Sequence, residues 1–102
     1  AYTTAAVIEA NHERYGEAKV YIRKALDRET GDPFAYLELA AIASAEDRRA
    51  AALRLVAQAR ALSPLDRVAR QVQRELRRGR FVTPERLNRL ILRDVDSRIG
   101  PR

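Results

Sequence analysis

The chain repeats its own pattern of small and large residues with a period of 34 positions. When the sequence is shifted by 34 positions, the matching pairs are Ala1/Ala35, Tyr2/Tyr36, Ala6/Ala40, Ile8/Ile42, Arg14/Arg48, Ala18/Ala52, Ala25/Ala59 and Asp32/Asp66. Several matches are alanines, but large residues recur at the same places as well. A regular period of about 20–50 residues is typical of folds in which one supersecondary unit stacks on the next. The sequence therefore predicts stacked copies of one unit.

Each unit has the pattern of two consecutive helices. In the second unit, Asp32 is a suitable N-cap, and Pro33 fits the first helical position, where its missing N–H costs nothing. Apolar residues then follow at helical spacing, and a second helix is expected over about residues 47–62. The first unit shows the same arrangement, with one helix opening over residues 2–8 and its partner over residues 15–26. Two helical hairpins are therefore expected.

Small residues lie where the two helices of each hairpin should cross. Ala6 is expected to face Ala18, and Ala40 is expected to face Ala52. Antiparallel helices approach to about 8 Å only where small side chains meet at the crossing. An ordinary alanine-rich helical bundle would also give this composition, and it is the alternative to a repeat architecture.

The last third of the sequence has a different pattern. Val68, Val72 and Leu76 form a narrow apolar stripe on a helix that is otherwise rich in arginine, and Gly79 lies in the break that follows. Thr83 is a suitable N-cap for a final amphipathic helix that ends before residues 100–101, a Gly-Pro pair. The predicted chain is all-α, with six helices.

Composition excludes most catalytic chemistry. The chain has no cysteine and one histidine, so thiolate nucleophiles, disulfides and cysteine metal sites are excluded. Glu9 and His12 have the Glu-x-x-His spacing of di-iron bundles, but such sites need a second copy and two further glutamates. No glycine-rich phosphate loop is present. We therefore expect no enzymatic activity, no metal and no cofactor.

At the repeated positions the chain resembles the tetratricopeptide (TPR) repeat family, whose unit is a 34-residue pair of helices. The second unit carries the family pattern as Tyr36, Leu39, Ala40, Ala52, Val56, Ala59 and Pro64, and the first as Tyr2, Ala5, Ala6, Tyr15, Ala18, Ile22 and Ala25. It departs from the pattern at Ala5, where leucine is usual, and at Thr30, where proline is usual. The resemblance covers about residues 1–66 and says little about the ligand.

The expected organisation is one helical domain, an α-solenoid fragment with C-terminal capping helices. Residues 1–32 and 33–66 form two TPR-like repeats, and residues 67–102 form the arginine-rich helix and the amphipathic capping helix. About three repeats are usually needed to bury a continuous core. The last two helices must therefore act as a cap, or a second copy of the chain must do so in a homodimer.

The resemblance implies a concave peptide groove lined by the first helix of each pair. The implied groove residues are Thr3, Val7, Phe34, Leu37, Ala41 and Ser44. These residues carry no charge, so the implied partner is a protein or peptide that offers an apolar helix or an extended hydrophobic segment. In the alternative interpretation, Phe34 and Leu37 are buried by the last helix of the chain itself or by a repeat upstream.

Positive charge is concentrated at the C-terminal end. Residues 1–66 hold 9 basic and 10 acidic groups and carry a net charge of −1. Residues 67–102 hold 11 basic and 4 acidic groups and carry +7, so the net charge of +6 comes entirely from this last third. The predicted anion-binding patch consists of Arg67, Arg70, Arg74, Arg77, Arg78 and Arg80. Guanidinium groups bind phosphates, so an anionic membrane surface is one reading of this patch. Nucleic acid is disfavoured because no RNA-binding motif or interleaved aromatic residue accompanies the arginines. A solvated helix face with Glu75 as local partner is the plain alternative.

Together these patterns predict a non-catalytic protein–protein interaction or scaffold module. Residues 59–66 and the segment that begins at Pro84 are also similar to the soluble TPR tails of bacterial O-antigen ligase or polymerase-like membrane proteins. That likeness implies a structural role in a larger bacterial protein. The chain does not begin with methionine, so we expect a soluble domain of a longer protein, either cytoplasmic or tethered to a membrane through upstream sequence. The competing function is a basic module that docks on anionic lipid or nucleic acid.

Overall fold

The structure is a computed structural model that describes residues 15–28 and 31–99. Within these residues the secondary structure consists of five α-helices and no strand. The helices are α2 (Tyr15–Arg28), α3 (Pro33–Ala45), α4 (Arg49–Leu62), α5 (Arg67–Arg77) and α6 (Pro84–Ile99). The all-α prediction is confirmed for this part of the chain. The first predicted helix, together with Thr3, Val7 and the Glu9/His12 pair, lies outside the described residues.

Local sequence signals determine where two of the helices begin. The Asp32 carboxylate accepts a hydrogen bond of 2.9 Å from the backbone N–H of Phe34, and the Asp66 carboxylate accepts an equivalent bond from Val68. Each aspartate satisfies an N–H group that the first turn of a helix leaves without a partner. The prediction that Asp32 is an N-cap is confirmed.

Gly79 allows the chain to turn away from the end of α5. Its φ of +82° lies in the left-handed region, and a Cβ at this position would lie 3.2 Å from Nη2 of Arg49. Residues with a side chain are disfavoured in this conformation. Glycine therefore lets the connection turn tightly against the start of α4 and lead toward α6.

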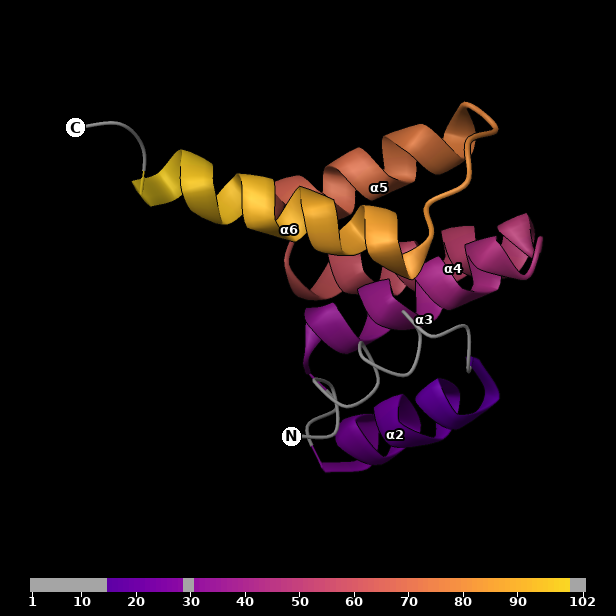
Figure 1. Ribbon diagram of the computed structural model, residues 1–102. Helices are drawn as coiled ribbons and strands as arrows, with labels where there is room; N and C mark the ends of the chain where they lie inside the picture. Colours follow the sequence, from indigo (N-terminus) through magenta and orange to yellow (C-terminus); the bar gives the residue numbers. More distant parts are fainter. Residues whose placement is uncertain (1–14, 29–30, 100–102) are drawn as a thin grey trace.

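Consecutive helices pack on one another, and α6 returns to contact both α3 and α5 (Figure 1). Helices α3 and α4 pack against each other, and Ala40 of α3 and Ala52 of α4 have no exposed surface, as expected if small side chains allow close approach. One apolar cluster joins α3 to the later helices, and a second joins α2 to α3. Because α3 is covered on several sides, most of its side chains are buried.

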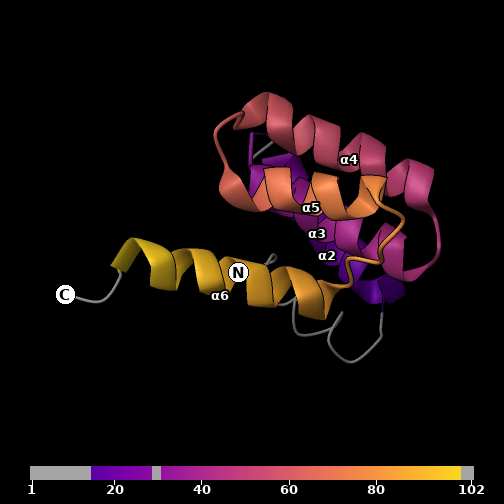
Figure 2. The same ribbon diagram turned by 90° about the horizontal axis from the view of Figure 1, so that it is seen from above.

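The C-terminal turns of α6 project beyond the ends of the other helices (Figures 1 and 2). The first half of α6 contributes buried side chains, including Leu87 and Leu90. Farther along, Leu92 and Val95 are exposed. None of the described helices is long and apolar enough to cross a membrane.

Candidate functional site

Three of the residues predicted to line a peptide groove are buried inside the protein. Leu37, Ala41 and Ser44 lie on α3 and are almost fully covered. The first two belong to the same apolar cluster as Val82 and Leu87, which precede and open α6. This face of α3 is therefore covered by the C-terminal part of the chain itself, as the alternative interpretation of the sequence described.

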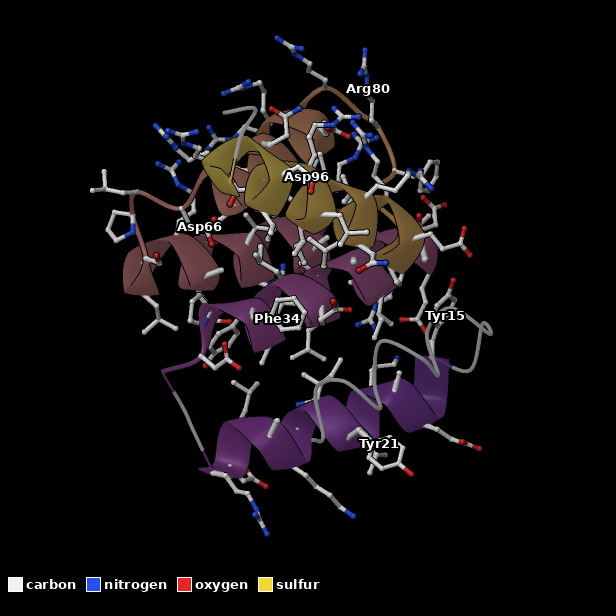
Figure 3. All side chains as sticks on the ribbon, turned by 60° about the vertical axis from the view of Figure 1, so that its left-hand side comes forward. Tyr15, Tyr21, Phe34, Asp66, Arg80 and Asp96 are labelled. Carbon is white, nitrogen blue, oxygen red and sulfur yellow. The ribbon has the colours of Figure 1, made fainter. Side chains whose placement is uncertain are left out.

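Phe34, by contrast, is half-buried at the edge of a groove of about 450 Å³. The first turn of α3, the α4–α5 connection and the projecting part of α6 form its walls, and Figure 3 shows Phe34 on the face of α3 beside α6. We call this the apolar groove. Its lining residues are Pro33, Phe34, Leu37, Ser63, Leu65, Asp66, Val68, Ile91, Asp94 and Val95.

The walls of the apolar groove expose large apolar side chains. Leu65 is 84% exposed and Val95 is 43% exposed. Single exposed hydrophobic residues are common on soluble proteins. Here, however, two of them come from different elements and line one groove that also contains Phe34 and Ile91, and such concentrations often mark interaction sites.

The structure distributes the six predicted arginines over three separate hollows. Arg70, Arg74, Arg77 and Arg78 line one groove between α4 and α5, together with Arg60 of α4. We call this the arginine groove, and its sixth lining residue is Gln73. Sequence reasoning missed Arg60 because it belongs to the preceding helix, and no spacing along α5 could indicate it.

The other two arginines of the predicted patch lie elsewhere. Arg67 lines a hollow between α5 and α6 that also contains Arg93 and Asp94. Arg80 lines a small recess next to Phe81 and points outward from the connection that follows α5 (Figure 3). The six residues therefore do not form one continuous face.

Glu75 pairs with α6, whereas the sequence suggested it as a partner for the exposed arginines of its own helix. Both of its oxygens accept hydrogen bonds from the Arg86 guanidinium, at 3.1 and 2.9 Å, and Gln71 donates a further bond of 2.8 Å. These contacts with Arg86 hold the pKa of the buried Glu75 carboxyl below its ordinary value. Glu75 therefore fastens α5 to α6.

Glu38 on α3 is another buried acidic side chain, and unlike Glu75 it has no partner within the part of the chain that the structure describes. It is 1% exposed, and neither carboxylate oxygen has a hydrogen-bond partner among these residues. Burial raises the pKa of Glu38 to about 8. Glu38 lines none of the grooves described above. Among the described residues, no group of three histidine, cysteine or acidic side chains could hold a metal ion.

A further hollow of about 720 Å³ lies between α2 and α4. It is bordered by an ion pair between Lys19 and Glu46, with the charged atoms 3.1 Å apart, and by other charged side chains. Its lining thus mixes charges of both signs with apolar residues, and this mixture does not favour one chemical class of ligand over another.

Comparison with known proteins gives no relative from which a function could be transferred. No family model, curated protein or solved structure matches this chain. The grooves themselves are therefore the basis for inferring a function.

Proposed function

We propose that this chain is a non-catalytic interaction module of TPR-like helical hairpins, and that it binds an apolar segment of a protein partner in the apolar groove. The observation that carries the proposal is the exposure of Leu65, in the α4–α5 connection, and Val95, on α6, in the lining of one groove. Burying these side chains against a partner would stabilise a complex by about 1.5–3 kcal/mol for each side chain that becomes fully covered.

The packing of the helices supports the hairpin part of this proposal. Successive helices contact each other in chain order, and Ala40 and Ala52 are buried where α3 meets α4. The 34-residue repetition of the sequence would then reflect the repetition of one hairpin. The concave face implied by the TPR resemblance is covered by the C-terminal helix on α3, so the proposed binding surface lies at its edge.

The shape of the apolar groove fits a peptide better than it fits a flat protein surface. Its volume of about 450 Å³ falls within the range of 300–1,000 Å³ that is typical of ligand pockets. Two of its walls are helices, and an amphipathic helix or a short extended segment can place apolar side chains between them. Because the contacts would be mainly apolar, we expect binding to depend only weakly on salt.

The proposal is tested with peptides selected from a random displayed library on the complete chain. Selected peptides are then measured by fluorescence anisotropy against Leu65→Ser and Val95→Ser. The matched control is Leu92→Ser, which removes an exposed apolar side chain of α6 that does not line the groove. We expect each groove variant to weaken binding about tenfold, as the loss of a largely buried apolar side chain implies, and the control to change it less than about twofold.

Two results would contradict the proposal. In the first, the selection gives only strongly acidic peptides whose binding is lost at high salt, which would favour an electrostatic module. In the second, Leu65→Ser binds the selected peptides as well as the wild-type chain does. Sedimentation of the chain alone shows whether a second copy occupies the groove, since self-association lost in Leu65→Ser would identify a homodimer.

A further inference from the structure

The arginine groove has features that the proposed peptide site does not use. It is a hollow of about 310 Å³ between α4 and α5. Five of its six lining residues are arginines, and the sixth is Gln73. No acidic residue lines it, so the groove collects five positive charges in a small volume.

The charges in the arginine groove are not neutralised by the described part of the protein. The ion pairs Lys19–Glu46 and Arg86–Glu75 involve no residue that lines the groove. Arg74 donates a hydrogen bond to the amide oxygen of Gln71, which carries no charge. Like charges held close together repel one another, and an anion bound in the groove would relieve the repulsion.

One arginine is held in place by a buried polar side chain. Gln73 is 8% exposed, and its amide oxygen accepts a hydrogen bond from Nη1 of Arg60. The Nε atom of Arg60 is buried and has no hydrogen-bond partner among residues 15–28 and 31–99, and a ligand in the groove would not reach it. The bond to Gln73 therefore fixes the orientation of the guanidinium at the wall of the groove. This second observation distinguishes the groove from a solvated stripe of arginines.

The arrangement of the remaining arginines favours an anion with several charged centres. Arg70 and Arg74 are four residues apart on α5, which corresponds to about 6 Å of rise along the helix axis. Arg77 and Arg78 follow on the same face at the end of α5. The favourable effect of cations near a helix C-terminus would account for Arg60 at the end of α4 and for Arg74 and Arg77 at the end of α5. It does not account for Arg70, which lies in the first turn of α5, nor for the arrangement of both helix ends around one groove.

We propose that the arginine groove binds a small ligand that carries at least two phosphate groups. Guanidinium groups donate paired hydrogen bonds that match the oxygens of phosphate, and several phosphates are needed to engage arginines from both helices. The volume of the groove is close to the lower limit of ligand pockets, which favours a small ligand over a nucleic acid. A free polyphosphate and a phosphorylated lipid headgroup share this chemistry.

The first experiment is a calorimetric titration of the complete chain with inorganic triphosphate at near-physiological salt. We expect one saturable site, with sulfate binding far more weakly. Arg77→Gln should weaken binding about tenfold, because a charge-assisted hydrogen-bonding partner is lost. The control is Arg89→Gln, which makes the same change in net charge at an exposed residue of α6 that lines neither proposed groove.

A second variant tests the role of the buried amide. Gln73→Glu places a carboxylate beside Arg60 without changing the size of the side chain, so it should abolish triphosphate binding while the helical content stays the same. Vesicles that contain a phosphoinositide bisphosphate, compared with phosphatidylserine vesicles of equal charge, distinguish a headgroup from a free ligand. Preference for the bisphosphate vesicles, lost in Arg77→Gln, identifies the headgroup, whereas triphosphate binding without that preference identifies a free polyphosphate.

Three results would overturn the proposal. One is the absence of saturable triphosphate binding, and another is an equal loss of affinity in Arg77→Gln and Arg89→Gln. The third is binding to duplex DNA that is as tight as binding to triphosphate and equally sensitive to Arg77→Gln, which would show a general basic surface. Because the apolar groove is lined by other residues, all three results leave the peptide proposal unaffected.

Discussion

The Ser44 hydroxyl on α3 accepts a hydrogen bond of 2.8 Å from the backbone N–H of Val82, which lies 38 residues later in the chain. Both groups are buried. The bond fixes the segment before α6 against the end of α3. It therefore helps to determine where α6 begins, and with it one wall of the apolar groove.

Replacing Ser44 with alanine should destabilise the protein by about 1–3 kcal/mol, because a buried N–H group would lose its partner. The free energy of unfolding in urea measures the effect. Ser63→Ala is the matched control, since this loop residue is only half-buried. An equal effect of the two substitutions would show that the bond to Val82 contributes nothing.

Removing residues 80–102 should expose the apolar surface that α6 covers on α3 and α5. Leu37 and Leu76 are among the buried residues that would meet water. We expect the shortened chain to aggregate or to dimerise, as measured by size-exclusion chromatography with light scattering. A shortened chain that stays monomeric with an unchanged Tm would refute the capping role of α6.

Glu38 should make the protein less stable as the pH rises. Its pKa is about 8 in the folded protein, against an ordinary value of 4.5, so the folded state holds a proton that the unfolded state releases between these values. Stability is therefore highest below about pH 4.5 with respect to this group, and it falls as the pH approaches 8. The expected loss is on the order of a few kcal/mol.

Glu38→Gln tests this assignment because it keeps the shape of the side chain but cannot ionise. Urea unfolding between pH 5 and 8 should lose most of its pH dependence in this variant, which should be more stable than the wild type at pH 8. Glu85→Gln changes an exposed glutamate of α6 and should leave the slope unchanged. A wild-type chain whose stability does not fall over this range would show that Glu38 finds a partner.

The ion pair between Glu75 and Arg86 should have the opposite effect and make the protein more stable as the pH rises. Because the folded-state pKa of Glu75 is lowered, its contribution is present above the ordinary value of 4.5 and is lost as the pH falls through the lowered value. Glu75→Gln should cost about 2 kcal/mol near pH 7, and it leaves the partly exposed Arg86 without its partner. A double-mutant cycle with Arg86→Leu and Glu75→Leu measures the coupling, and full additivity would contradict the interaction.

The sequence predicted the features that depend on neighbouring residues. Asp32 is an N-cap because its carboxylate reaches the next turn, and this needs only local spacing. The burial of Ala40 and Ala52 also agrees with a prediction based on residue size. Glu38 stands out in the sequence as the single charged residue of an otherwise mostly apolar helix. Whether its pKa is shifted, however, depends on how completely neighbouring helices cover it, and the sequence does not specify this.

Features that depend on distant segments could not be predicted in the same way. The contact between Ser44 and Val82 depends on the path of the chain after Gly79, which no periodicity specifies. For the same reason the sequence left open whether Leu37 is exposed to a ligand or covered by the last helix, and the structure shows it to be 2% exposed. It also could not place Arg60 beside the arginines of α5, because that depends on the crossing of two helices.

The central claim is that the C-terminal part of the chain covers the inner face of α3 and that a partner binds beside it in the apolar groove. The most direct measurement is hydrogen exchange at the Val82 backbone N–H, which donates to the Ser44 hydroxyl. We predict strong protection of this N–H in a monomer that binds the selected apolar peptides, and much faster exchange in Ser44→Ala. Exchange of the Val82 N–H as fast as in an unstructured chain, or absence of apolar peptide binding by a chain that protects it, would contradict the account.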